Sequence, residues 1–110
     1  MNIQIFGKSK CFDTKKAERY FKEHRIKYQM IDLPRYGISP RELEAVKVSV
    51  GLVALIDENA KGAELLRYLA YDSDKLQRLI EEPTLIKTPI VRNGKKATVG
   101  YCPDVWKTWE

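Results

Sequence analysis

The hydrophobic and polar positions in the first third of the chain predict a strand, a helix and a second strand. Residues 2–6 are rich in β-branched and aromatic side chains and are followed by Gly7, a pattern typical of a strand. Over residues 12–24, apolar side chains recur at helical spacing opposite a charged face. Residues 28–33 predict a second, largely buried strand. A strand, a crossover helix and a strand imply a parallel pair with a right-handed connection.

The next helix has clear start and stop signals. It follows a turn predicted at residues 34–38. Ser39 is in the N-cap position, Pro40 is the first helical residue and Glu42 completes a capping box. Gly51 is expected to end this helix.

Residues 52–82 have helical patterns that are broken into short pieces. The segment closes at Pro83, which cannot continue a helix. Together with the preceding helix it forms a helical insert at about residues 39–82. Its predicted apolar stripes are Leu65, Leu66, Leu69 and Ala70, then Leu76, Leu79 and Ile80.

The last part of the chain returns to a strand pattern. Residues 88–91 and 96–99 predict two strands, and Asn93-Gly94 between them predicts a two-residue hairpin turn. Pro103 then starts a short helix. The order β-α-β, helical insert, β-β-α predicts an α/β protein with a mixed four-stranded sheet and helices on its faces, which is the thioredoxin-like plan.

The composition is that of one ordinary globular domain covering residues 1–110. The 110 residues leave little room for a second core, and 44% hydrophobic with 32% charged residues argues against disorder. No apolar stretch is long enough to span a membrane, and the N-terminus resembles a strand rather than a signal peptide. We therefore expect a cytoplasmic protein that does not bind a membrane.

The charge favours anionic partners without identifying one. The net charge is +5, from 20 basic and 15 acidic residues. No recognised nucleic-acid-binding motif accompanies this excess, so we do not expect direct binding of nucleic acid. No Cys/His cluster has metal-ligand spacing, and we expect neither a metal nor a bound cofactor.

Cys11 is the strongest candidate for chemistry, because it lies at the predicted start of the first helix. Unpaired N–H groups and the helix dipole favour an anion there. Lys8 and Lys10 precede it and Lys15 follows one turn later, so each should favour the thiolate, whereas Asp13 acts against it. The alternative is a buried structural cysteine near a helix end.

Thr14 occupies the position in which a dithiol protein carries its second cysteine. Its hydroxyl can donate a hydrogen bond to the Cys11 sulfur, but it cannot resolve a mixed disulfide. Turnover would then need an external thiol, such as glutathione or a partner protein, or the distant Cys102. Cys102 is therefore either a resolving thiol or a small buried residue.

The other conspicuous residues have structural interpretations that compete with functional ones. His24, near the end of the first helix, suits the helix dipole. Trp106 and Trp109 are expected to form a hydrophobic clamp rather than a platform for stacking bases. Arg92, near the hairpin tip, is either solvated or, together with Lys8 and Lys10, part of an anion-binding group.

Two segments resemble the arsenate reductase/Spx-like (ArsC-like) family, and the likeness covers nearly the whole chain. They are I-F-G-K-S-K-C-F-D-T-K-K-A and P-T-L-I-K-T-P-I-V-R-N-G-K-K-A-T-V-G-Y, with the long helical insert between them. The resemblance implies a thioredoxin fold with an extra helical subdomain. It also implies that Cys11 is the nucleophile and that Pro89 is a cis-proline facing it. The implied catalytic group is then Cys11, Thr14, Lys10 and Pro89.

The chain departs from the pattern of the arsenate-reducing members, which hold the oxyanion with arginines. Thr88 precedes Pro89, where those members have an arginine. Gly100-Tyr101-Cys102-Pro103 follows the hairpin, where they have another, and Arg67 is only a loose match for a third in the insert. Without each of these arginines, the site lacks one charge-assisted hydrogen bond to the oxyanion. We therefore expect arsenate to be a poor substrate, with partial compensation from Lys10 and Arg92.

Two functional hypotheses follow from the resemblance. The first is a thiol-dependent oxidoreductase that uses Cys11, with glutathione or a glutaredoxin- or thioredoxin-type protein completing the cycle. The second is a non-catalytic, Spx-like regulatory protein that docks on RNA polymerase or another protein. Many Spx-like members carry a C-x-x-C switch, and the C-x-x-T of this chain cannot form that local disulfide.

Overall fold

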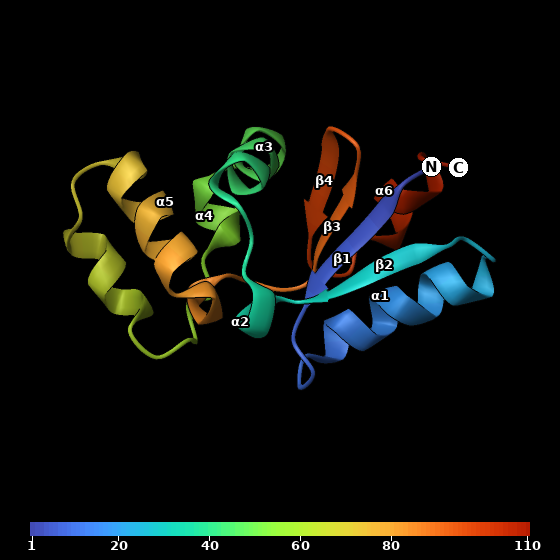
Figure 1. Ribbon diagram of the computed structural model, residues 1–110, viewed down its shortest axis with the longest axis horizontal. Coiled ribbons are helices and arrows are strands. Elements are labelled where there is room, and N and C mark those ends of the chain that lie inside the picture. The colour runs from blue at the N-terminus through green and yellow to red at the C-terminus, as the bar shows by residue number, and fades with distance from the viewer.

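The sheet is built from the two ends of the chain. A computed structural model describes residues 1–110 and has four strands in the order β2-β1-β3-β4. β1 runs parallel to β2 and antiparallel to β3, which pairs with β4, so the predicted mixed sheet is confirmed (Figure 1). The strands are β1 (Ile3–Gly7), β2 (Tyr28–Asp32), β3 (Ile90–Asn93) and β4 (Lys96–Val99).

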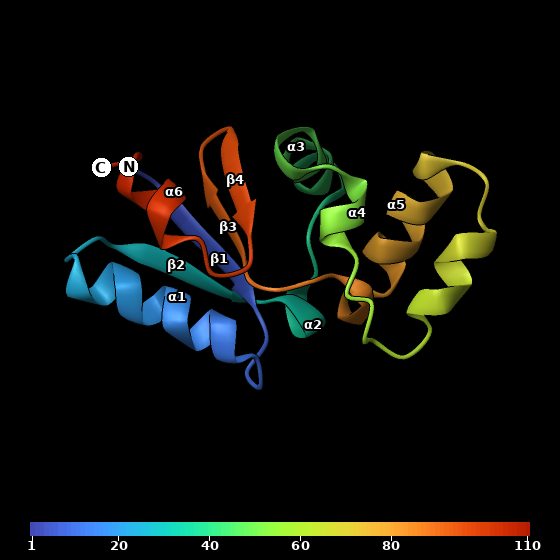
Figure 2. The same cartoon turned by 180° about the vertical axis from the view of Figure 1, so that it is seen from behind.

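Helices lie on both faces of this sheet, and a helical insert extends beyond one end of it. α1 (Phe12–Glu23) and α6 (Pro103–Lys107) are near the chain ends, which lie close together (Figure 2). The insert contains α2 (Leu33–Tyr36), α3 (Pro40–Val50), α4 (Leu52–Leu55), a 3₁₀ helix η1 (Ala63–Tyr68), α5 (Asp72–Glu81) and a 3₁₀ helix η2 (Pro83–Leu85).

No helix of the protein has the length and apolar character needed to cross a membrane.

The predicted capping box at the start of α3 is present. The backbone N–H of Glu42 donates to Ser39 Oγ at 3.1 Å, and the N–H of Ser39 donates to Glu42 Oε1 at 3.2 Å. Gly51, with φ of 84°, ends the helix in a conformation that favours glycine. The reciprocal cap therefore fixes where α3 begins.

Three predictions about the insert and its approach were wrong. Residues 34–38 were expected to form a turn, but α2 spans most of them, with proline in its first turn. β2 is not largely buried, because it lies at an edge of the sheet. Leu65 and Ala70 are exposed. η1 has about three residues per turn and directs Ala63 and Leu66 inward rather than Leu65, and Ala70 lies beyond the end of this helix.

The hairpin also differs from its prediction by one residue. Asn93 pairs with Lys96, so the two-residue loop is Gly94-Lys95 rather than Asn93-Gly94. Only Gly94 has a positive φ, 61°, as expected for a turn with glycine in the first central position. β3 correspondingly begins at Ile90, two residues later than predicted.

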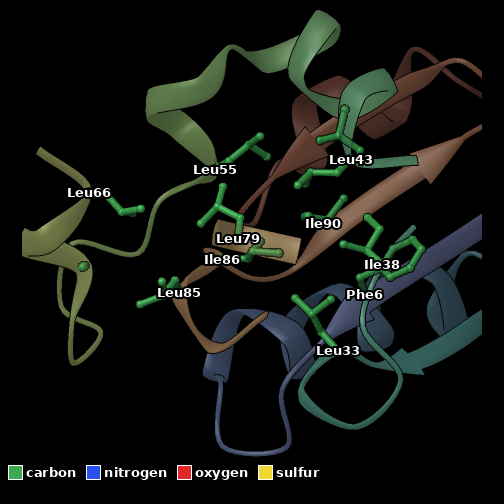
Figure 3. Packing of buried hydrophobic residues seen from close by; sticks show 12 residues of the cluster. Phe6, Leu33, Ile38, Leu43, Leu55, Leu66, Leu79, Leu85, Ile86 and Ile90 are labelled. Atoms are coloured by element: carbon green, nitrogen blue, oxygen red, sulfur yellow. The ribbon is translucent and has the colours of Figure 1, made fainter. Parts of the chain in front are cut away.

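Two hydrophobic clusters hold the layers together, one on each face of the sheet. Ile3 and Ile5 of β1 point to the face covered by α1 and α6, where Trp106 is fully buried. Trp106 Nε1 donates to Thr98 Oγ1 at 2.8 Å, so this residue has the expected structural role. On the other face, Phe6 and Ile90 contact apolar side chains of the insert (Figure 3).

Tyr20 in the first cluster should make folding stability depend on alkaline pH. Burial is the largest cause that raises the pKa of Tyr20. The hydrogen bond that its hydroxyl donates to Glu110 Oε2 at 3.0 Å, and the negative charge of that carboxylate, raise this pKa further, to about 12. An unfolded tyrosine ionises near pH 10. The stabilisation from neutral Tyr20 is therefore complete below pH 10 and is lost as the pH rises from 10 to 12.

We predict that the wild type loses stability relative to Tyr20→Phe above pH 10, by up to about 1.4 kcal/mol per pH unit. Urea unfolding of both proteins between pH 8 and 11.5 measures this difference. Parallel stability curves would show that the Tyr20 hydroxyl ionises as readily in the folded as in the unfolded chain.

Candidate functional site

Cys11 lies at the junction between β1 and α1, as predicted. It is the N-cap residue of α1, with extended backbone angles, and its side chain is partly exposed. Its N–H donates to the carbonyl oxygen of Lys8 at 3.1 Å, and its own carbonyl accepts from the N–H of Lys15 at 3.3 Å. The backbone of Cys11 is therefore held at the helix N-terminus, where unpaired N–H groups favour an anion.

The segment before β3 lies against this cysteine. The thiol donates to the carbonyl oxygen of Thr88 at 3.6 Å, and the Thr88–Pro89 peptide bond is cis, as the resemblance implied. Thr14 is buried one turn into α1, and its hydroxyl accepts from the N–H of Lys8 at 3.4 Å. Two hydroxyl-bearing residues, Thr14 and Thr88, thus lie near one sulfur.

These hydroxyls make the Cys11 thiol more acidic. Burial raises the pKa of Cys11, but the side chains of Thr14 and Thr88 and the backbone N–H groups of Thr14 and Asp13 lower it more, so the net shift is downward. The sequence predicts that Lys8, Lys10 and Lys15, together with the N–H groups at the start of the helix, favour the thiolate. The causes that lower this pKa are hydrogen-bond donors, each of which stabilises the thiolate directly.

An open depression of about 330 Å³ gives access to the thiol. Lys8 is held at its edge, since its Nζ donates to the carbonyl oxygen of Thr84 at 3.0 Å and lies 3.7 Å from Asp57 Oδ2. Three lysines against one carboxylate leave the depression positively charged, which suits a ligand with anionic groups. The lining residues are Lys8, Lys10, Cys11, Asp57, Lys87 and Thr88.

Backbone pairing between distant segments brings Asp57 and Lys87 to this depression. The N–H of Asp57 donates to the carbonyl of Leu85 at 2.8 Å, and the N–H of Lys87 donates to that of Leu55 at 2.7 Å. An isolated antiparallel bridge joins the residues between them. We did not predict these two residues, because no local pattern pairs segments 30 positions apart. Thr88 could have been identified from its place beside the implied cis-proline.

Neither arginine proposed for anion binding lines the depression. Arg92 Nη1 donates to Glu42 Oε2 at 3.1 Å and to Gln4 Oε1 at 3.2 Å. It lies four residues beyond Thr88, about 13 Å along the chain at strand spacing. Arg67 is in η1, away from Cys11. Of the proposed anion-binding group, only Lys8 and Lys10 are beside the thiol.

Cys102 has a different environment from Cys11. It is the N-cap residue of α6, and its Sγ donates to the carbonyl oxygen of Val99 at 3.4 Å. Burial raises the pKa of the Cys102 thiol, in contrast to that of Cys11. Both cysteines are free thiols, and Cys102 does not line the depression. Its resolving role stays a prediction.

Comparisons of sequence support the resemblance. The ArsC family profile matches residues 6–109 of this chain. The global transcriptional regulator Spx 2 from Oceanobacillus iheyensis is 34% identical over 110 residues, covering 94% of this chain and 80% of the relative.

Comparisons of structure support the predicted fold. The arsenate reductase from Vibrio cholerae superimposes with a TM-score of 0.83 at 22% identity, covering 96% of this chain and 94% of that chain. The glutaredoxin-like protein NrdH-redoxin from Escherichia coli gives a TM-score of 0.53 at 18% identity, covering 100% and 96%. The thioredoxin-like fold is therefore confirmed.

Proposed function

Because the chain belongs to the ArsC family, we propose that it is a thiol-dependent oxidoreductase with Cys11 as its nucleophile. The observation that carries this proposal is the environment of the sulfur. Cys11 combines a helix N-terminus, a lowered pKa and an open, positively charged depression. A cysteine with only a structural role needs none of these features.

The proposed cycle consists of two thiol–disulfide exchanges. The Cys11 thiolate attacks one sulfur of a substrate disulfide, whose S–S bond breaks, and the other half leaves as a thiolate that takes a proton from water. A thiolate from glutathione or from a glutaredoxin- or thioredoxin-type protein then attacks the mixed disulfide at its substrate-derived sulfur. This step returns Cys11 as a thiolate and forms a new disulfide. In each cycle one incoming thiolate replaces one half of the substrate disulfide, which leaves as a thiol, so thiols and disulfides balance.

The surrounding residues have distinct parts in this cycle. The hydroxyl of Thr14 donates to the Cys11 thiolate, both before attack and when it leaves the mixed disulfide. Lys10 attracts the carboxylates of an approaching thiol or disulfide. Pro89 and the preceding Thr88 form the segment opposite the sulfur, against which the substrate would lie.

The second candidate is a regulatory protein, which the 34% identity to a transcriptional regulator favours. Spx-like regulators bind RNA polymerase, so this enzyme is the candidate partner. Both candidates place the chain in the cytoplasm, where thiols are kept reduced. They differ in whether docking needs the Cys11 thiol.

We expect the protein to catalyse reduction of the mixed disulfide of glutathione and mercaptoethanol by glutathione. Coupling the glutathione disulfide formed to glutathione reductase and NADPH measures the rate, and mass spectrometry under non-reducing conditions should find glutathione on Cys11. No turnover and no adduct, together with co-purification of RNA polymerase, would support the regulatory role instead.

A further inference from the structure

The helical insert contributes a carboxylate to the Cys11 depression. Asp57 Oδ2 lies 3.7 Å from Lys8 Nζ, and Asp57 Oδ1 accepts from the N–H of Asn59 at 3.0 Å. The side chains of Lys8 and Asp57 are only 21% and 32% exposed. Asp57 is therefore a positioned charge rather than a freely moving surface carboxylate.

The backbone beneath Asp57 is fixed by the hydrophobic core. Leu55, Leu85 and Ile86 are almost completely buried and lie together where the insert meets the sheet (Figure 3). The hydrogen bonds from Asp57 to Leu85 and from Lys87 to Leu55 join the same segments. Asp57 and Lys87 are thus held as one unit beside the thiol.

The charges of the depression do not match a compact oxyanion. Asp57 pairs with Lys8, whereas Lys10 and Lys87 have no ion-pair partner. A multiply charged oxyanion would be attracted by the two unpaired lysines, Lys10 and Lys87. It would also be repelled by the carboxylate of Asp57 and by the Cys11 thiolate. A ligand with both carboxylate and ammonium groups can use the lysines and Asp57 together.

We propose that Asp57 sets the charge selectivity of the Cys11 site, disfavouring compact oxyanions and favouring amino-acid-type disulfides that carry ammonium as well as carboxylate groups. This inference rests on the proposed oxidoreductase function and names its substrate class. It also gives a structural reason to expect poor use of arsenate. The insert supplies a negative charge to the site where a cation would be needed.

Charged thiol reagents test this proposal without requiring turnover. In the Cys102→Ser background, Cys11 is treated with methanethiosulfonates bearing a sulfonate or a trimethylammonium group. The thiolate attacks the sulfenyl sulfur, and methanesulfinate leaves with the bonding electrons. We expect Asp57→Asn to raise the ratio of the anionic to the cationic rate constant by about five-fold or more, since one nearby charge is removed.

The matched control is Glu58→Gln, which removes the same charge one residue along, from an exposed side chain outside the depression. It should change the ratio little, and the effect of Asp57→Asn should shrink at high salt. If Asp57→Asn folds poorly, Asp57→Ser retains an acceptor for the N–H of Asn59 and should give the same result. An unchanged ratio in the folded Asp57 variant would overturn the proposal, even if turnover is observed. A raised ratio supports it, even if the disulfide assay fails.

Discussion

Replacing Cys11 with serine should abolish disulfide turnover. A serine hydroxyl does not ionise near neutral pH, so none of the donors around position 11 can convert it into a comparable nucleophile. We expect the glutathione-dependent rate to fall by at least about a hundred-fold, to the uncatalysed background. The coupled glutathione reductase assay measures this loss, and circular dichroism should show an unchanged fold, because the side chain is partly exposed.

Cys102→Ser is the control for this experiment. Burial raises the pKa of the Cys102 thiol, which leaves little thiolate to attack a mixed disulfide at neutral pH. We therefore expect this variant to retain most of the turnover, with an external thiol completing the cycle. An equally severe loss of turnover in Cys102→Ser would indicate that Cys102, rather than an external thiol, resolves the mixed disulfide.

Hydrogen-bond donors, from hydroxyls and from backbone N–H groups, lower the pKa of Cys11. These donors are the hydroxyls of Thr14 and Thr88 and the N–H groups at the start of α1. They act on the Cys11 sulfur over short distances and are partly shielded from solvent. Salt screens them less than it screens lysines at the surface. In the proposed oxidoreductase, Lys10 and Lys87 would then be free to contact the substrate, which would separate activation of the nucleophile from recognition of the ligand.

The fold was largely predictable because its strongest signals are local. The period of α1, the capping box at Ser39 and the strand patterns of β1 and β3 each lie within a short window. The short elements of the insert were not predictable in the same way. At η1, spacing of three replaced the spacing expected for an α-helix, and tertiary packing decided which side chains are buried.

From the residue pattern alone, the site was predictable only where it comes from one segment, and the family resemblance added the cis-proline Pro89. Cys11, Thr14, Lys8 and Lys10 lie within seven residues, so the strand–loop–helix junction predicts their proximity. Predicting that Asp57 belongs to the site would require knowing that the insert pairs with the segment before β3. For Arg92, the sequence showed a cation near the hairpin but not the carboxylate of Glu42 that engages it.

Gly7→Ala should damage both the stability of the fold and the reactivity of Cys11. A Cβ at Gly7 would overlap Thr14 Cγ2 and would lie only 2.8 Å from Thr14 Oγ1. Thr14 is buried within α1, so relief requires either a helix shift or a new side-chain conformation. We expect a loss of about 1–3 kcal/mol in the free energy of unfolding. We also expect slower alkylation of Cys11 at neutral pH, because the displaced hydroxyl no longer stabilises the thiolate.

A double-mutant cycle separates the steric overlap from the general cost of replacing a glycine. In a Thr14→Ala background the atoms that Gly7→Ala would overlap are absent, and the remaining close contact, 2.9 Å to Met30 Cε, is the end of a flexible side chain. Gly7→Ala should therefore cost less stability there, with a coupling of about 0.5–3 kcal/mol. It should also leave the alkylation rate at its Thr14→Ala value. Gly94→Ala, at the distant hairpin, should lower stability through its positive φ alone and leave Cys11 reactivity unchanged. Additive effects of the two substitutions would mean that Gly7 does not support the thiol through Thr14.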